Sequence, residues 1–275
     1  MERAVEQVQL LQNLRPQAQL IAAQALDVID TNYSYNGNAY NDPAAELYMP
    51  YHNGTHTRNV MRDALWLSDI FGLNDEEKET AVLAASAHDI SHELDATNGE
   101  SEALSADWLE WLMLKRDDTF SKRQRKNARL AILGTFAQIE VGPYAVIVQQ
   151  ATQQDYPSKQ AEIIAHIVAA ADLGRFCRPD GPTISHHYHQ ELVTGASGKQ
   201  PTIDERLLNY QKHQTEIVAG RSYTYPTPLL EKALATHRPE VYAYDVSLVT
   251  DLQAGNIESW DTLLQRDQEF MQKNS

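Results

Sequence analysis

Apolar residues recur at steps of three and four along most of the chain, which is the period of an amphipathic helix. Pro16 interrupts the first helical stretch and is expected to kink or split it. The pattern predicts helices at residues 3–30, 55–71, 75–92, 100–116, 122–137, 158–176, 203–220, 227–235, 239–253 and 257–272.

Two stretches lack this pattern and are predicted to be irregular. Residues 31–53 are rich in Asn, Tyr and Gly, which is typical of a long loop, and residues 178–202 contain enough Pro, Gly and Ser to predict a loop with one helical turn. Asn74 with Glu77 three residues later predicts a capped helix start. Residues 141–148 (VGPYAVIV) are the one candidate strand and fit a helix equally well.

The expected fold class is therefore all-α, in one compact multi-helix bundle spanning residues 1–275. We find no internal repeat and no linker composition in the sequence. A chain of 275 residues can bury a substantial core as one large domain or as two small ones. The lack of a linker favours one domain.

Composition and charge narrow the function. The formal net charge of −15 argues against a nucleic-acid backbone as the main partner. Cys177 is the single cysteine of the sequence, so no disulfide can form within the chain, and a reducing compartment is expected. The N-terminal residues lack a signal-peptide profile, and no apolar stretch is long enough to span a bilayer. We therefore expect a soluble cytoplasmic protein without a membrane partner.

Histidine and aspartate residues form three short elements. His52 and His56 are four residues apart, as are His88 and His92, so on a helix each pair would share one face. Asp89 adjoins His88, and a third element ends in Asp172. A single histidine of this kind is more often an ordinary hydrogen-bonded residue than a ligand, but two pairs with flanking aspartates favour a metal site.

The sequence before His88 and before Asp172 is rich in alanine (AVLAASAHD and IVAAAD). Small side chains let helices approach closely, so the polar groups at their ends would meet inside a bundle. Burying unpaired carboxylates there is costly, and a metal ion offsets that cost. Imidazole and carboxylate ligands suit zinc, manganese, iron, cobalt, nickel or magnesium.

The three elements YHNGTH (51–56), HDISH (88–92) and AADLG (170–174) together resemble the HD-domain superfamily of metal-dependent phosphohydrolases. Within it, the pattern is most similar to class I cyclic nucleotide phosphodiesterase catalytic domains. The resemblance covers about residues 50–220 in the same order. It implies a helical bundle of that type, with terminal helices at 1–30 and 221–275 packed on the core.

The resemblance implies two divalent metal ions. His56, His88, Asp89 and Asp172 would hold the first, which would be Zn, Mn, Fe, Co or Ni. Asp89 would bridge to a second ion, Mg or Mn. Two cations that share a hydroxide lower its pKa and hold it in line with phosphorus.

Three further residues take catalytic roles by resemblance. His52 would be the general acid that protonates the departing ester oxygen, a task suited to imidazole near neutral pH. His92 would hydrogen-bond the water around the metals. Glu102 would orient metal-bound water, although a solvated carboxylate at a helix start is an equal alternative.

The predicted substrate residues are Gln214, Ile217, Tyr51 and Asn53. Gln214 would read a purine base, and Ile217 stands where the phosphodiesterases place a stacking Phe. Gln211 is an alternative residue for binding the base. Equally well, Gln214 is an ordinary surface residue and Ile217 an ordinary core residue of an amphipathic helix. Asn53 would anchor the loop that carries His52, unless it is an ordinary turn residue.

The chain departs from the phosphodiesterase pattern at several positions. Asn59 replaces an Asp, Glu93-Leu94 replaces Pro-Gly, and Arg175 stands where Ser-Asn is preferred. These changes spare the metal ligands but weaken the inference about the substrate. The histidines at 186–189 are predicted to lie in a solvated loop, and Trp108 and Trp111 in the core or at an interface.

The leading hypothesis is hydrolysis of a phosphate ester in a small nucleotide, most simply a 3′,5′-cyclic nucleotide. An HD-type nucleotidase or nucleoside triphosphate phosphohydrolase is the alternative, since the same metal core serves those reactions. A catalytically silent protein that binds metal or nucleotide is a third. The sequence leaves open whether the chain forms a homodimer.

Overall fold

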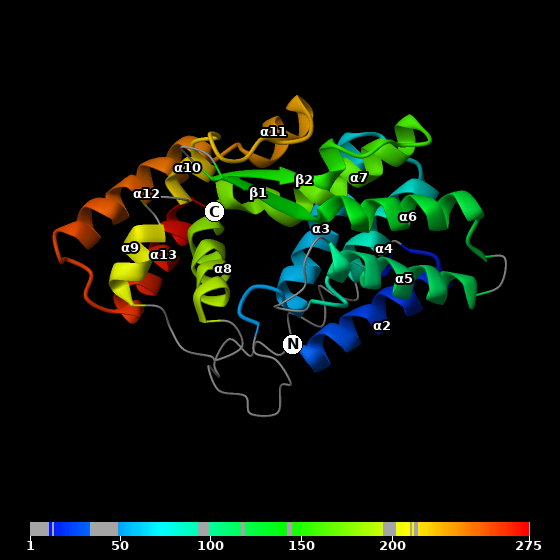
Figure 1. Cartoon of the computed structure of the whole chain (residues 1–275), viewed down its shortest axis with the longest axis horizontal. Coiled ribbons are helices and arrows are strands. Elements are labelled where there is room, and N and C mark those ends of the chain that lie inside the picture. Colours follow the sequence, from blue (N-terminus) through cyan, green and yellow to red (C-terminus); the bar gives the residue numbers. More distant parts are fainter. Residues whose placement is uncertain are drawn as a thin grey trace. The chain divides into compact units, whose positions relative to one another are not determined.

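A computed structural model of the chain describes residues 11–12, 14–33, 49–92, 99–116, 119–141, 145–194, 202–209, 211 and 214–274 (Figure 1). These residues form helices and a single two-stranded sheet. The prediction of an all-α fold is confirmed. No helix among the described residues is long and apolar enough to cross a bilayer.

Contacts within the chain divide it into two compact units. Unit 1 comprises residues 1–137 and 149–172, and unit 2 comprises residues 138–148 and 173–275. The prediction of one domain over residues 1–275 stays a prediction, and each unit is described by itself.

Unit 1 is built around one central helix. Its elements are α2 (Pro16–Asn32), α3 (Gly54–Ile70), α4 (Asp75–Ala87), α5 (Glu100–Leu114), α6 (Lys122–Thr135), the 3-10 turn η2 (Gln150–Thr152) and α7 (Lys159–Leu173, whose last residue falls in unit 2). α4 packs against α2, α3, α5 and α6. Every α4 residue from Glu79 to Ala87 is buried, and most are small, so neighbouring helices approach it closely.

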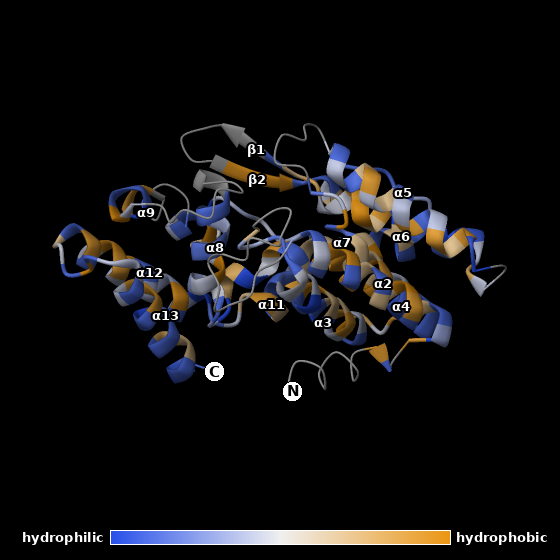
Figure 2. Cartoon of the chain, turned by 90° about the horizontal axis from the view of Figure 1, so that it is seen from below, coloured by the Kyte–Doolittle hydropathy of each residue, from blue (hydrophilic) through white to orange (hydrophobic). Residues whose placement is uncertain are grey.

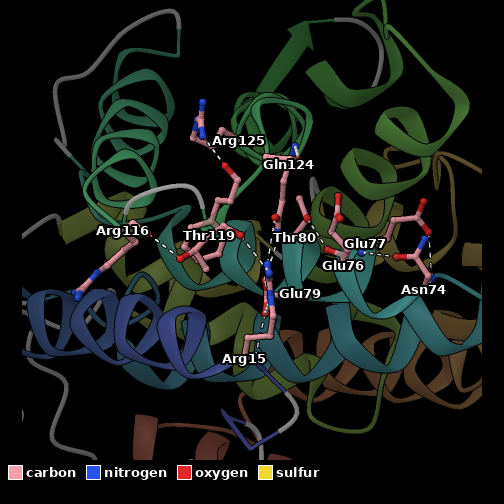
Figure 3. Close-up of polar contacts among 12 residues, drawn as sticks. Arg15, Asn74, Glu76, Glu77, Glu79, Thr80, Arg116, Thr119, Gln124 and Arg125 are labelled. Carbon is pink, nitrogen blue, oxygen red and sulfur yellow. Dashed lines mark hydrogen bonds and ion pairs between the residues drawn. The ribbon is translucent and has the colours of Figure 1, made fainter.

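Hydrogen bonds at the helix ends fix these elements. The predicted capping box is confirmed: Asn74 accepts from the Glu77 N–H, and the Glu77 carboxylate accepts from the Asn74 N–H (Figure 3). Figure 3 also shows Arg15, just before α2, donating to the buried Glu79 of α4 through Nε at 3.0 and 3.1 Å. Gln124 of α6 donates to the same carboxylate at 3.0 Å, so one buried acid joins three helices.

α3 approaches α2 at a glycine. A Cβ built on Gly54 would lie 1.8 Å from Oδ1 of Asp30, so any larger residue here would displace the Asp30 side chain. Asp30 also accepts two hydrogen bonds from Arg58, at 2.8 and 3.2 Å. The contact fixes the N-terminal end of α3, where His52 and His56 lie.

Unit 2 is a second group of helices with a hairpin. It contains η3 (Gly174–Cys177), α8 (Gly181–Thr194), α9 (Ile203–Asn209), α10 (Thr215–Val218), α11 (Pro228–Leu234), α12 (Arg238–Gln253), α13 (Trp260–Asn274) and most of strands β1 (Ala137–Val141) and β2 (Ala145–Gln149). Leu248, Leu252, Ile257 and Leu263 form one of its buried apolar clusters. Colouring by hydropathy shows apolar and polar residues interspersed along the helices (Figure 2).

Pro16 opens α2, because proline fits the first helical turn, where no N–H is needed. This start agrees with the predicted split at Pro16, and residues 1–10 and 13 lie outside the described residues. Other predicted elements differ from the structure at their ends. The helix predicted at 122–137 ends at Thr135. Strands β1 and β2 follow it and pair with each other. Within the helix predicted at 203–220, α9 covers Ile203–Asn209 and α10 covers Thr215–Val218, and residues 210, 212 and 213 lie outside the described residues.

The largest error is at residues 178–202. A 14-residue helix, α8, replaces most of the predicted loop. Gly181 and Pro182 suggested a break, yet both lie in the first turn of α8, where proline is tolerated. The remaining residues up to Thr194 contain no helix breaker. Residues 34–48 of the predicted loop 31–53 lie outside the described residues.

The histidine cluster at 186–189 is consequently not a solvated loop. His186 and His189 are buried on α8, which packs against α12 and α13 within unit 2. Nε2 of His186 contacts the carboxylate of Asp267 on α13, which also accepts a 2.7 Å hydrogen bond from the Tyr244 hydroxyl. The i, i+3 spacing places His186 and His189 on one buried helix face.

Candidate metal centre

Four side chains of unit 1 converge on one buried point. His56 comes from the first turn of α3, His88 and Asp89 follow the end of α4, and Asp172 lies near the end of α7. All four are buried. The structure thus brings together the residues predicted to hold the first metal.

The distances within this cluster fit a shared cation. Nε2 of His56 lies 3.0 Å from Oδ1 of Asp172 and 3.5 Å from Oδ2 of Asp89. Nε2 of His88 lies 3.0 Å from Oδ2 of Asp89, 3.7 Å from Oδ1 of Asp172 and 3.3 Å from Nε2 of His56. Two ligands each about 2.1 Å from a metal lie about 3.0 Å apart at a right angle and about 3.4 Å apart at the tetrahedral angle.

Hydrogen bonding prepares His88 to be a ligand. Its Nδ1 lies 2.8 Å from the carbonyl oxygen of Ala85. A carbonyl oxygen can only accept, so Nδ1 carries the hydrogen and Nε2 of the neutral ring keeps its lone pair. A backbone carbonyl that fixes the tautomer in this way is usual for histidines that bind metals.

The carboxylates are held ionised. Burial would raise the pKa of Asp172, but hydrogen bonds from His56 and His88 outweigh it and lower that pKa to about 2. Burial likewise opposes ionisation of Asp89, yet His88, His52 and His56 hold its pKa well below the usual range. Oδ2 of Asp89 is nevertheless buried without a hydrogen-bond donor of good geometry. These buried anions and an imidazole lone pair facing one another suit a bound cation.

The site shifts the pKa values of His56 and His88 in opposite directions. Burial is the main influence on His56 and lowers its pKa, despite the hydrogen bond to Asp172. Burial also acts to lower the pKa of His88, but the carboxylates of Asp89 and Asp172 outweigh it and raise that pKa well above its ordinary value.

A second group shares Asp89 with the first. Ligand atoms of His52, Asp89 and His92 lie within 4.8 Å of one another, as do those of His56, His88 and Asp89. The rings of His52 and His92 stack with their centroids 3.8 Å apart. Either group can hold a metal ion, and Asp89 is common to both.

Glu102 lies close enough to these groups to respond to their charge. Burial is the main cause that raises the pKa of Glu102, and the carboxylates of Asp89 and Asp172 raise it further. It occupies the first turn of α5 and is half-buried. The alternative of a fully solvated helix-start carboxylate therefore does not describe it.

Neither histidine pair shares a helix, although the predicted helix 75–92 contained both His88 and His92. α3 begins at Gly54, after His52, and α4 ends at Ala87, before His88. His52 and His92 lie in the irregular segments that flank these helices, so an i, i+4 face does not bring either pair together. Capping and turn contacts do so instead.

Asn53 is the residue that positions the first pair. Its Oδ1 accepts from the N–H groups of Thr55 at 2.9 Å and His56 at 3.2 Å, which caps α3. Its Nδ2 donates to the carbonyl oxygens of Met49 at 3.0 Å and Pro50 at 2.9 Å. Asn53 thus anchors the loop that carries His52, as predicted, while its role towards substrate stays a prediction.

Comparisons with known proteins do not assign the chain to a family. No protein-family model matches the chain, and no curated protein matches it either. The helical fold with its buried His/Asp cluster is compatible with an HD-type fold.

Two positioning residues were missed by the sequence analysis. The Tyr33 hydroxyl donates to the Ile90 carbonyl at 3.2 Å and accepts from the His92 N–H at 2.9 Å. The Ser105 hydroxyl, on α5, accepts from the Ser91 N–H at 3.0 Å. Together they hold the turn that follows His88. Neither position carries a sequence signal, because a lone Tyr or Ser has many ordinary uses.

The remaining predicted substrate residues are buried. Tyr51 has its ring centroid 4.4 Å from that of His56, and its hydroxyl donates to the Asp172 carbonyl at 3.4 Å. Gln214 and Ile217 are buried in unit 2. The predicted contact of these residues with substrate stays a prediction.

Proposed function

We propose that the chain is a metal-dependent phosphohydrolase acting on a small nucleotide, with 3′,5′-cyclic nucleotides as the first candidates. The observation that carries the proposal is the convergence of His56, His88, Asp89 and Asp172 on one buried point, with separations of 3.0 to 3.7 Å. The motif resemblance supplies the reaction class.

His56, His88, Asp89 and Asp172 would hold a first ion of Zn, Mn, Fe, Co or Ni. Asp89 would also contact a second ion, Mg or Mn, on the side of His52 and His92, which share its neighbourhood. Bound divalent cations would supply a nucleophile at neutral pH and offset the negative charge of the phosphate. The excess of anions in the cluster supports such occupancy.

His52 is the proposed general acid. It is half-buried at the edge of the cluster, stacked on His92 and near the anionic Asp89. An anion beside an imidazole favours its protonated form. His52 would deliver a proton to the departing ester oxygen.

Glu102 and His92 would order water around the reacting phosphate. The raised pKa of Glu102 reflects burial next to two other carboxylates. Tyr33, Ser105 and Asn53 would act only through the residues they position.

The test is a substrate panel with purified, metal-reconstituted protein. The panel contains 3′,5′-cyclic nucleotides, nucleoside monophosphates and nucleoside triphosphates. Hydrolysis of cyclic nucleotides supports the full proposal, and hydrolysis of mono- or triphosphates alone favours the nucleotidase alternative. Nucleotide binding without turnover under every metal would overturn it in favour of a silent binding protein.

Two variants separate the proposed roles. Asp89→Ala is expected to abolish turnover, because both ions would lose a ligand. His52→Ala is expected to keep its metal and lose roughly 10²- to 10⁴-fold in kcat, the usual contribution of a general acid. His237→Ala, which changes a half-buried histidine outside both groups, is the matched control and should retain full kcat. Loss of metal in His52→Ala would make His52 a ligand instead.

A further inference from the structure

Helix α5 exposes an apolar face. Leu104 is 49% exposed, Trp111 53% and Leu114 55%, so this one helix carries three of the nine large apolar side chains that are exposed in the described part of the chain. The opposite side of α5, with Leu109 and Leu112, is already buried in unit 1. Exposed apolar patches of this kind mark interaction surfaces.

Charges of opposite sign lie at the two ends of this face. Five α5 residues recur at steps of four, four, three and four: Glu100, Leu104, Trp108, Trp111 and Lys115. At about 100° per residue, these steps keep all five within roughly 80° of the helix circumference. Nζ of Lys115 lies 5.4 Å from the Trp111 ring centroid, so the basic end adjoins the apolar centre.

We propose that a second copy of this chain docks on the α5 face, with the two α5 helices antiparallel about a two-fold axis. In that register Glu100 faces the partner's Lys115, and Leu104 faces the partner's Trp111. Trp108 lies near the axis. A two-fold interface must be self-complementary, and a face with an acid at one end and a base at the other meets this condition when antiparallel.

The charge pattern favours a second copy over a lipid surface. Helices that lie on membranes carry several basic residues beside their apolar face. The α5 face carries the acids Glu100 and Asp107, the second of them paired with Arg129, and the base Lys115. The chain also carries a net charge of −15, which opposes binding to anionic lipid.

The dimer would also brace the metal centre. α5 carries Glu102, whose pKa responds to the charge of the cluster. It also carries Ser105, which holds the turn after His88. Docking on the outer face of α5 would steady these inner groups. The inference does not rest on the proposed function, because oligomeric state is measured without a substrate.

The first test compares molar mass by sedimentation equilibrium over a range of concentrations. The full chain should dimerise, and Trp111→Glu should raise the dimer dissociation constant by at least about 30-fold, as for a hot-spot residue. Leu20→Glu, at a side chain 51% exposed on α2, is the matched control and should dimerise normally. Unchanged circular dichroism of each variant establishes that it folds.

The second test checks the antiparallel register by charge exchange. Glu100→Lys and Lys115→Glu should each weaken self-association, because like charges then meet twice across the axis. An equimolar mixture of the two variants should form heterodimers, and the double variant should recover the homodimer. A monomeric wild-type chain, a dimer that survives Trp111→Glu, or a mixture that associates no better than its components would overturn the proposal. Binding of a monomeric chain to lipid vesicles through Trp111 would also overturn it.

Discussion

The Nε2 atoms of His56 and His88 lie 3.3 Å apart in the interior of unit 1. Two ring nitrogens cannot face each other so closely with both lone pairs bare, since nothing would offset their repulsion. A proton on one of them or a shared cation resolves the contact. Because Asp89 and Asp172 add two anionic oxygens, a divalent cation resolves it best.

This relationship predicts stabilisation by metal. At a free metal concentration 100-fold above its dissociation constant, the folded chain should gain about 2.7 kcal/mol. For a unit of this size the gain corresponds to a rise in Tm of about 5–10 °C. Differential scanning fluorimetry with Zn²⁺, Mn²⁺ or Ni²⁺, before and after chelation, measures it. His88→Ala should show no shift, and an equal shift in that variant would place the metal elsewhere.

Asn53 is predicted to matter for both stability and turnover. Asn53→Ala removes the cap of α3 and should cost about 1–2 kcal/mol of unfolding free energy. It should also lower kcat, because the loop that carries His52 loses its anchor. Asn74→Ala removes the corresponding cap of α4 and is the matched control, with lower stability but normal kcat. If both variants lose kcat equally, Asn53 has no special role at the site.

The Arg15–Glu79 pair is predicted to be a major contributor to stability. Glu79 is 3% exposed. Arg15→Ala would leave this buried carboxylate without its cationic partner, although it could still accept from Gln124 and from the N–H of residue 15. The expected loss is about 3 kcal/mol in urea unfolding. Arg58→Ala removes a more exposed ion pair with Asp30 and should cost less than about 1 kcal/mol. Similar losses in the two variants would contradict this ranking.

His186 predicts a pH dependence of stability. Burial, reinforced by Arg206 and opposed by Asp267, lowers the His186 pKa to about 4. In the unfolded chain histidine titrates near 6.5, so between pH 6.5 and 4 the unfolded state binds a proton that the folded state does not. The free energy of unfolding therefore decreases as the pH falls through this window. The slope from this residue is at most about 1.4 kcal/mol per pH unit.

Urea midpoints at several pH values for wild-type and His186→Gln measure this contribution. The variant should show a shallower decline between pH 6.5 and 4, and both proteins should be flat above pH 7. A variant with an unchanged slope would mean that His186 is charged in the folded chain, as an ion pair with Asp267.

The helices of unit 1 were predictable because local signals define them. Periodicity located α3 to α7, and Asn74 with Glu77 fixed the start of α4. α8 was missed because Gly181 and Pro182 suggest a turn when their place in a first helical turn is unknown. The candidate strand at 141–148 overlaps β2, but β1 was missed because its pairing with β2 leaves no signal in its own residues.

The metal centre was predictable for a different reason. Motif resemblance named His56, His88, Asp89 and Asp172, whereas the spacing of the histidines suggested helix faces that do not exist. The turn that joins His88 to His92 depends on Tyr33 and Ser105, which are far away in sequence. Such contacts follow only from the folded chain.

The most direct test of the central claim is hydrolysis of 3′,5′-cyclic adenosine and guanosine monophosphates by the metal-reconstituted chain. We predict steady release of the nucleoside monophosphate, its loss on chelation, and its return when Mn²⁺ or Mg²⁺ is restored to protein that retains the first ion. Asp89→Ala should remain inactive throughout. A chain that binds metal at the His56–His88 cluster but hydrolyses no phosphate ester under any of these metals would contradict the account.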